Sequence, residues 1–98
     1  MDNYVLAFRG PADRAAAPDE DEAWSAWFGS LGGAVVDFGH RVGHVRALPA
    51  KGGKPASSVL TGYLVIAAND LEAAITTAQG CPGLSCGVSV EVGEIVVA

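Results

Sequence analysis

The sequence predicts an α+β domain in which two helices cover one face of a four-stranded antiparallel sheet. Two observations support this fold class. Strand-like runs flank a helix-like run twice along the chain, which is the order of the split βαβ arrangement, with both helices on the same face. The run at 62–68 is apolar at both odd and even positions, as in a strand that is covered on both of its faces.

The first quarter of the chain contains the first strand and the start of the first helix. Residues 3–9 alternate in the period of a strand, and Gly10 ends that run before an aperiodic loop that reaches residue 18. Asp19 and Glu22 match the spacing of a helix-capping box. Large apolar side chains then recur at helical intervals in a bulky stripe that we expect to pack on the sheet, formed by Trp24, Trp27, Phe28 and Leu31.

The middle of the chain is the least regular part. A pair of glycines ends the first helix, and residues 34–37 predict a second strand. From 38 to 48 the pattern is mixed and interrupted by glycine, which is consistent with a twisted strand or a strand with a bulge. Residues 49–58 are rich in turn formers and have no apolar anchors, which predicts an exposed and mobile loop.

The strand at 62–68 leads directly into a second predicted helix. We expect Asn69 to cap this helix, with Glu72 reaching back to the cap from three residues later. A narrow apolar stripe of mostly small side chains follows, formed by Leu71, Ala74, Ile75 and Ala78. Such a stripe allows close approach to a sheet.

The last predicted strand follows a short loop. Gly80 and Pro82 end the second helix, and alternating valines from 88 to 92 have the period of a strand with one wetter face. Gly93 and Glu94 break this alternation, so we expect a bulge or a bend there.

Length and composition restrict the classes of protein. A chain of 98 residues predicts one domain, spanning 1–98, because a second core would not fit. Half of the residues are hydrophobic and 17% are charged, which leaves little polar surface for a monomer and favours a homodimer. The net charge of −5 and the pI of about 4.7 argue against nucleic acids and anionic membranes as partners.

The acidity is concentrated in the run 19–22. Carboxylates in the first turn of a helix complement its positive end, and a contact with a basic partner is the alternative explanation. No apolar run approaches the roughly 20 residues that cross a bilayer, and the first residues lack a basic region ahead of an apolar one. We therefore expect a cytoplasmic protein.

Cys81 and Cys86 are separated by four residues, whereas redox and zinc pairs are separated by two. We expect them to be small loop residues, and the sequence implies no cofactor.

Five ionisable residues gather within ten positions of the glycine-rich middle segment and form the main candidate site: Asp37, His40, Arg41, His44 and Arg46. A histidine beside a carboxylate suits general acid–base chemistry, so Asp37, His40 and His44 are the catalytic candidates, with Arg46 as a ligand-binding candidate. The alternative is a solvated hairpin edge. Along a strand, His40 and His44 would lie about 13 Å apart, at roughly 3.3 Å per residue, too far to chelate one ion, so no metal is expected.

Three polar residues of the predicted strands are further ligand-binding candidates. Glu91 alternates with valines and therefore points away from their face, either into a cleft or into solvent. Arg9, at the end of the first strand, is placed to neutralise Glu91 or to bind an acidic ligand. Tyr63 belongs to the apolar strand at 62–68.

The second face of the predicted sheet also needs a cover, since the strand at 62–68 is apolar on both sides. The sheet of a second subunit would supply it. This ferredoxin-like arrangement is a dimeric α+β barrel, in which ligand clefts lie where sheet, loops and partner meet.

The second half of the chain resembles the YCII-related (DGPF) proteins. The resemblance rests on 62–74, on Gly80-Cys81-Pro82 and on Val90-Glu91-Val92 with a following Glu94-Ile95. It implies a dimeric α+β barrel and a small-molecule function, since some members look like enzymes acting on lactones or chlorinated aromatic breakdown products. Others accompany extracytoplasmic sigma factors. A His and an Asp are suspected as a functional pair in some members, with Asp37, His40 and His44 as counterparts here.

The chain departs from the family just before Gly62, where residues 54–60 replace the Asp-Gly-Pro-Phe segment, so chemistry of that segment is not carried over. Three functions follow from the sequence. The first is a barrel that binds or acts on a small carbonyl or lactone-type molecule by His/Asp chemistry. The second is an accessory or regulatory dimer without catalysis, and the third is a heteromeric adaptor that uses the acidic helix start.

Overall fold

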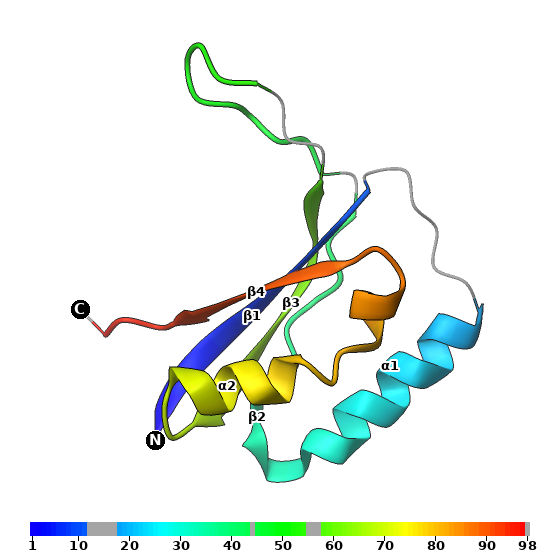
Figure 1. Ribbon diagram of the computed structural model, residues 1–98, viewed down its shortest axis with the longest axis vertical. Coiled ribbons are helices and arrows are strands. Elements are labelled where there is room, and N and C mark those ends of the chain that lie inside the picture. The colour runs from blue at the N-terminus through cyan, green and yellow to red at the C-terminus, as the bar shows by residue number, and fades with distance from the viewer. Residues whose placement is uncertain (12–17, 44, 55–57, 98) are drawn as a thin grey trace.

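The computed structural model describes residues 1–11, 18–43, 45–54 and 58–97 (Figure 1). Two short 3-10 helices, η1 and η2, accompany the main helices and strands. In chain order the elements are β1 (Asp2–Gly10), α1 (Pro18–Leu31), η1 (Gly32–Ala34), β2 (Val35–Asp37), β3 (Val59–Ala68), α2 (Leu71–Ala78), η2 (Pro82–Ser85) and β4 (Ser89–Glu94).

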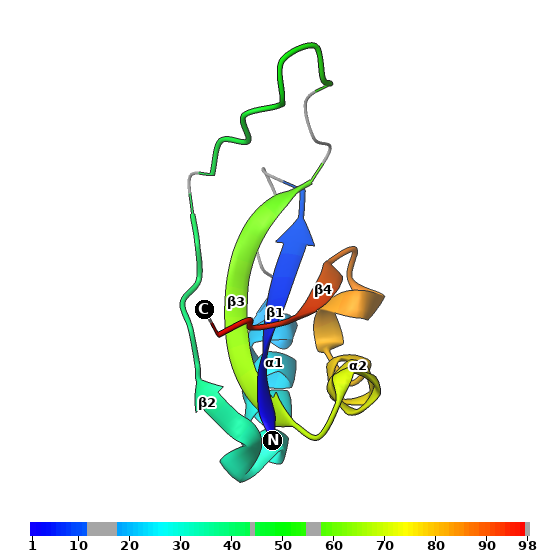
Figure 2. The same ribbon diagram turned by 90° about the vertical axis from the view of Figure 1, so that its left-hand side faces the viewer.

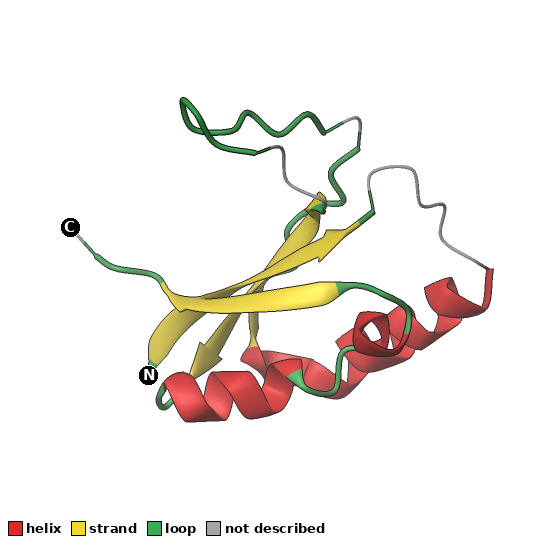
Figure 3. Ribbon diagram, turned by 45° about the horizontal axis from the view of Figure 1, so that its top comes forward, coloured by secondary structure: helices red, strands yellow, loops and turns green. Residues whose placement is uncertain are grey.

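The strands form one four-stranded sheet in the order β2-β3-β1-β4, and every neighbouring pair is antiparallel. Figure 3 shows two layers, with both helices against the same face of the sheet. Figure 2 looks onto the other face of the sheet, with α1 behind the strands, and no described helix lies on this face. The predicted α+β fold is therefore confirmed, and its strand order and helix placement are those of a ferredoxin-like arrangement.

The core lies between the sheet and the helices. Burial alternates along β1 from Tyr4 and along β3 from Gly62, because successive side chains of a strand point to opposite faces. Leu6, Leu64 and Ile66 are completely buried on the helix side, and Tyr4 and Phe8 of β1 extend this buried row. The odd-numbered residues between them face the other way and are only half-buried.

The start of α2 differs from the prediction. The cap is Asp70, not Asn69, and the Asp70 carboxylate accepts a 2.8 Å hydrogen bond from the amide of Ala73. The backbone of Asp70 is extended, which is the conformation that lets an N-cap side chain turn back to the third amide of the helix. Both residues are good N-caps by type, and the spacing to Glu72 favoured Asn69, one residue before the true cap.

The bulge predicted at Gly93 and Glu94 is not present. The β4 strand continues through Glu94 in regular register with β1, with Gly93 opposite Val5. Glycine has no side chain to show which face of the sheet its position belongs to. The apolar–polar alternation is therefore interrupted at Gly93 although the strand is regular there. The register is irregular instead between Phe8 and Arg9, where β1 pairs with β3.

The edge of the sheet beyond β3 is short and then irregular. After the three residues of β2, the chain continues beside β3 through a single bridge between Arg41 and Gly62. Next to this bridge, the carbonyl of His40 accepts a 3.3 Å hydrogen bond from the amide of Tyr63. The described residues beyond it lead into a long connection that extends away from the two layers (Figure 1). In the described residues, no helix has the length and apolar character needed to span a bilayer.

Candidate functional site

A pocket of about 450 Å³ opens on the helix side of the sheet, between α1, the paired strands β1 and β3, and the segment 38–41. Its size falls in the range of ligand sites, roughly 300–1,000 Å³. Large apolar rings form most of its walls: Phe8, Trp24, Phe28 and Phe38. The pocket is therefore mainly apolar, with polar groups confined to part of its lining.

The bulky stripe of α1 explains why a pocket exists here. The ring of Trp24 meets Phe8 edge-on with centroids 4.9 Å apart, and Phe28 meets Phe38 edge-on at 6.2 Å. Large rings hold the helix away from the sheet, and edge-to-face pairs leave gaps that a stack of aliphatic side chains would fill. Trp27, one turn along, is buried and completes the core below.

Two glycines let the segment 38–41 lie close against β3, opposite α1. Gly39 has φ of +66°, and a Cβ atom there would lie 2.0 Å from the carbonyl oxygen of Tyr63, so only glycine allows this close approach of the two backbones. Gly62 lies directly opposite Phe8 in the sheet, and a Cβ on Gly62 would come within 3.2 Å of the carbonyl oxygen of His40. The absence of a side chain at 62 therefore gives room for the backbone of 40–41.

The polar lining is basic and hydroxylic. Arg41, His40, Thr61 and Ser25 line the pocket, and no carboxylate is among the described residues that do so. The Thr61 hydroxyl donates a 3.2 Å hydrogen bond to the carbonyl of Phe8, so it is partly committed to the fold. Arg41 makes no ion pair with any residue that the structure describes.

The structure separates the predicted catalytic residues. The Asp37 carboxylate accepts a 2.8 Å hydrogen bond from the amide of Gly39, which fixes the turn after β2. His40 is exposed, and its ring faces the ring of Tyr63 with centroids 6.1 Å apart. Within the described ranges no hydrogen bond or ion pair joins Asp37 to His40. His44, the third predicted catalytic residue, lies outside the described residues.

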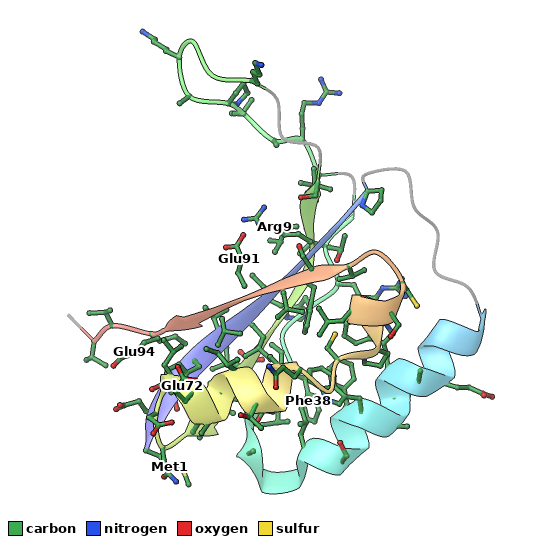
Figure 4. The ribbon with its side chains drawn as sticks, viewed as in Figure 1. Met1, Arg9, Phe38, Glu72, Glu91 and Glu94 are labelled. Atoms are coloured by element: carbon green, nitrogen blue, oxygen red, sulfur yellow. The ribbon has the colours of Figure 1, made fainter. Side chains whose placement is uncertain are left out.

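The predicted ligand-binding residues fall into different places. Tyr63 lines the pocket beside His40. Arg9 and Glu91 form an ion pair with each other on the side of the sheet turned away from the helices, as Figure 4 shows. Arg46 is exposed in the long connection and does not line the pocket.

The Arg9–Glu91 pair follows from the register of β1 and β4. Glu91 lies directly opposite Ala7, so Arg9 is its diagonal neighbour on the same face. Their side chains are 38% and 65% exposed. An ion pair this open to water contributes about 0–1 kcal/mol to stability, so its main effect is to neutralise two charges on an otherwise apolar face.

Sequence reasoning assigned the aromatic stripe of α1 to the core and missed its second role. That assignment is right for Trp27, which is buried, but Trp24 and Phe28 are only half-buried and line the pocket. The available signal was volume, because the stripe of the first helix is far bulkier than that of the second. Arg41 was recognised as part of an ionisable cluster without being chosen as a ligand-binding residue.

Neither cysteine belongs to this pocket. Cys81 is buried at the end of α2, and burial raises the pKa of its thiol above the ordinary value, which keeps the thiol neutral and unreactive at neutral pH. Cys86 is half-buried. The described residues contain no group of three or more His, Cys, Asp and Glu side chains that could hold a metal ion.

Comparison with known proteins gives no match, whether against family models, curated proteins or solved structures. What the geometry defines is a class: a small α+β domain with an aromatic-walled, basic-lined pocket beneath one end of its sheet. Its function has to be argued from that pocket and from the open face of the sheet.

Proposed function

We propose that this protein is a YCII-like dimeric α+β barrel that binds a small carbonyl or lactone-type molecule in the pocket beside α1. The main observation in support of this proposal is the pocket itself. It has the volume of a ligand site, aromatic walls that would contact an apolar body, and a few polar groups on one part of its lining. An α+β fold by itself has no fixed function, so the argument rests on this site.

The open face of the sheet supports a homodimer. Its central residues are Val5, Ala7, Val65 and Ala67, which are apolar, half-buried and covered by no helix of the described part of the chain. The Arg9–Glu91 pair removes the net charge from the adjoining part of this face. Two such faces packed sheet to sheet, about 10 Å apart, would bury both apolar surfaces. A contiguous apolar face of this kind is a typical interaction site.

Sedimentation of the purified protein tests the dimer. We expect a dimer for the natural chain and a monomer for Val65→Lys, which introduces a charge into the centre of the open face. Thr76→Lys is the matched control, because Thr76 is exposed on α2, and this variant should stay dimeric. A natural chain that sediments as a monomer at tens of micromolar would contradict the dimer.

Within this proposal, His40 is the residue available for proton transfer. It lines the pocket, it is reached by solvent, and its ring adjoins Tyr63. A histidine can exchange a proton near neutral pH with a carbonyl compound held beside it. Asp37 orders the turn that carries His40, through its bond to Gly39, and does not orient the imidazole directly.

A non-catalytic accessory or regulatory dimer, for example one associated with a sigma factor, is the second candidate. The observation in its favour is the lack of a hydrogen bond between Asp37 and His40 in the described part of the chain, because acid–base pairs normally need that contact. Such a protein would bind its ligand without converting it.

Binding and turnover of one lactone separate the two candidates. Dihydrocoumarin is a suitable probe, because its ring suits the aromatic walls and its hydrolysis is followed by absorbance. Amide NMR shifts around the pocket would report binding. Hydrolysis that is lost in His40→Gln while binding persists supports an enzyme, whereas binding without hydrolysis supports the regulatory dimer. If no pocket amide shifts at millimolar probe, the binding proposal is wrong.

A further inference from the structure

We infer that the pocket selects an anion: a flat apolar molecule whose carboxylate is held by Arg41 at the pocket mouth. This inference rests on the proposed function, since it assigns a ligand class to the same pocket. It goes further in stating which chemical group is recognised and which side chain recognises it.

The backbone directs Arg41 toward the pocket. Arg41 is bridged to Gly62, and directly paired residues of an antiparallel ladder place their side chains on the same face of the sheet. Gly62 is paired with Phe8, whose buried side chain lies on the helix side. The Arg41 side chain therefore leaves the ladder on the helix side as well, while the ring of the neighbouring His40 adjoins the ring of Tyr63.

The charge around the pocket is opposite to that of the whole chain. The protein has 11 acidic and 6 basic residues, yet among the described residues that line this pocket the charged side chain is Arg41, and none is a carboxylate. The nearest acidic residue along the chain, Asp37, has one carboxylate oxygen committed to the Gly39 amide. A guanidinium at the edge of an apolar cavity, with no counter-ion among the described residues, favours an anionic ligand.

The two arginines of the sheet make the contrast clear. Arg9 lies near the end of β1 with a partly exposed side chain, and Glu91 neutralises it. Arg41 makes no such pair within the residues that the structure describes. Arg9 is therefore satisfied by the fold, while Arg41 keeps its fork of donors available for a carboxylate.

The walls determine the body of the ligand. The ring of Trp24 is edge-on to Phe8, and the ring of Phe28 is edge-on to Phe38, so the exposed ring faces form flat boundaries. Phe38 is 63% exposed and lies on the helix side of the sheet (Figure 4), where a bound ring would cover it. Flat ligands stack well on such surfaces. A free volume of about 450 Å³ accommodates one or two fused rings with an acidic arm.

An isosteric pair of probes tests the inference. 1-Naphthaleneacetate and 1-naphthaleneacetamide have the same shape and differ in charge at neutral pH. Calorimetry would measure their affinities, and amide NMR would locate them. For the natural chain we expect the acetate to bind at least tenfold more tightly than the acetamide, with shifts at residues around the pocket.

Three variants make the test specific. Arg41→Gln should abolish the preference for the acetate while leaving the binding of the acetamide unchanged. Arg41→Lys keeps the charge without the planar fork and should retain part of the preference. Arg46→Gln is the matched control, because it removes the same charge from an exposed position outside the pocket, and it should behave like the natural chain. A native-like NMR spectrum is required of each variant, and Arg41→Lys serves if Arg41→Gln does not fold.

The outcomes distinguish the inference from the proposed function. If both probes bind the pocket equally, or if Arg46→Gln loses the preference as much as Arg41→Gln, selection by Arg41 is wrong and the pocket remains a binding site. If neither probe shifts the pocket amides, this inference is wrong, whereas the proposed function still depends on the lactone experiment. The inference is supported if the natural chain and Arg46→Gln prefer the acetate and Arg41→Gln does not.

Discussion

The two helices contact the same face of one sheet in different ways. The backbone of α2 lies close to β1, β3 and β4, because its buried residues, Ala74 and Ala78, have almost no side chain. The backbone neighbours of α1 are chiefly η1 and η2, and its contact with the sheet is made through the rings of Trp24 and Trp27. Close packing occurs at the α2 end, and the pocket is at the α1 end.

This difference shows how side-chain volume positions a site. Both helices have an apolar stripe at the same helical interval, yet small residues bring one helix onto the sheet and rings hold the other away. A cavity is compatible with stability at the second end only because the rings beneath it, Trp27 above all, still fill the deeper layer. The following predictions test this contrast, in order of decreasing effect.

Trp27→Ala should have the largest effect. It removes a buried ring from below the pocket, and we expect a loss of about 3–5 kcal/mol in the free energy of unfolding, measured by urea denaturation. Trp24→Ala is the comparison, because one side of that ring already faces the pocket, and its loss should be clearly smaller. Equal losses would show that Trp24 belongs to the closed core and that the pocket is not open in solution.

Ala74→Leu should disturb the close contact at the α2 end. Ala74 is completely buried, so extra methylene groups must displace the helix or the strands, at a cost of about 1–3 kcal/mol. The matched change at the other end is Ser25→Leu, which enlarges a pocket-lining residue and should change the free energy of unfolding by less than about 0.5 kcal/mol. If both variants lose the same amount, the two ends are packed alike.

Asp70→Ala tests the cap that holds α2 in place. The loss of the hydrogen bond to the Ala73 amide should lower the free energy of unfolding by about 1 kcal/mol. Asn69→Ala should cost much less, since Asn69 is not the cap. The reverse ranking of these two variants would return the cap to Asn69, as the sequence spacing suggested.

The buried phenol of Tyr4 should make the free energy of unfolding depend slightly on pH in the alkaline range. Burial raises the pKa of its phenol above the ordinary value of 10.0, with contributions from Glu94, Asp2 and Asp70. The unfolded state then loses the proton first, so this contribution is fully present below pH 10 and declines as the pH rises toward the folded pKa. Urea unfolding between pH 8 and 11 should show a shallower decline for Tyr4→Phe than for the natural chain. Parallel curves would contradict this assignment.

Much of the fold could be predicted from the sequence because it depends on local periodicity. The alternation in 3–9 and the doubly apolar run at 62–68 are patterns of neighbouring residues. Both segments are central strands of the sheet. The cap of α2 was placed one residue early, since Asn69 and Asp70 have the same chemistry and only the backbone conformation decides between them. Glycine at 93 was interpreted as a break because it has no side chain to report a face.

The candidate site was less predictable. Asp37 and His40 are close in sequence, but the Asp37 carboxylate accepts a hydrogen bond from the Gly39 amide instead of contacting the imidazole. The pocket depends on residues more than 30 positions apart, such as Trp24 and Gly62, and on the gap between rings. No local pattern contains that gap, which arises only when the helix and the sheet are brought together.

Both tryptophans lie in α1, so the tryptophan fluorescence of the protein comes from one end of the molecule. Trp24 and Trp27 are 5.8 Å apart and adjoin Phe8, whereas α2 contains no aromatic residue. Tryptophan emission therefore reports the state of the α1 end, and Trp24 responds directly to anything that enters the pocket while Trp27 stays shielded. Unfolding that begins at α2 would escape fluorescence and require amide exchange to be seen.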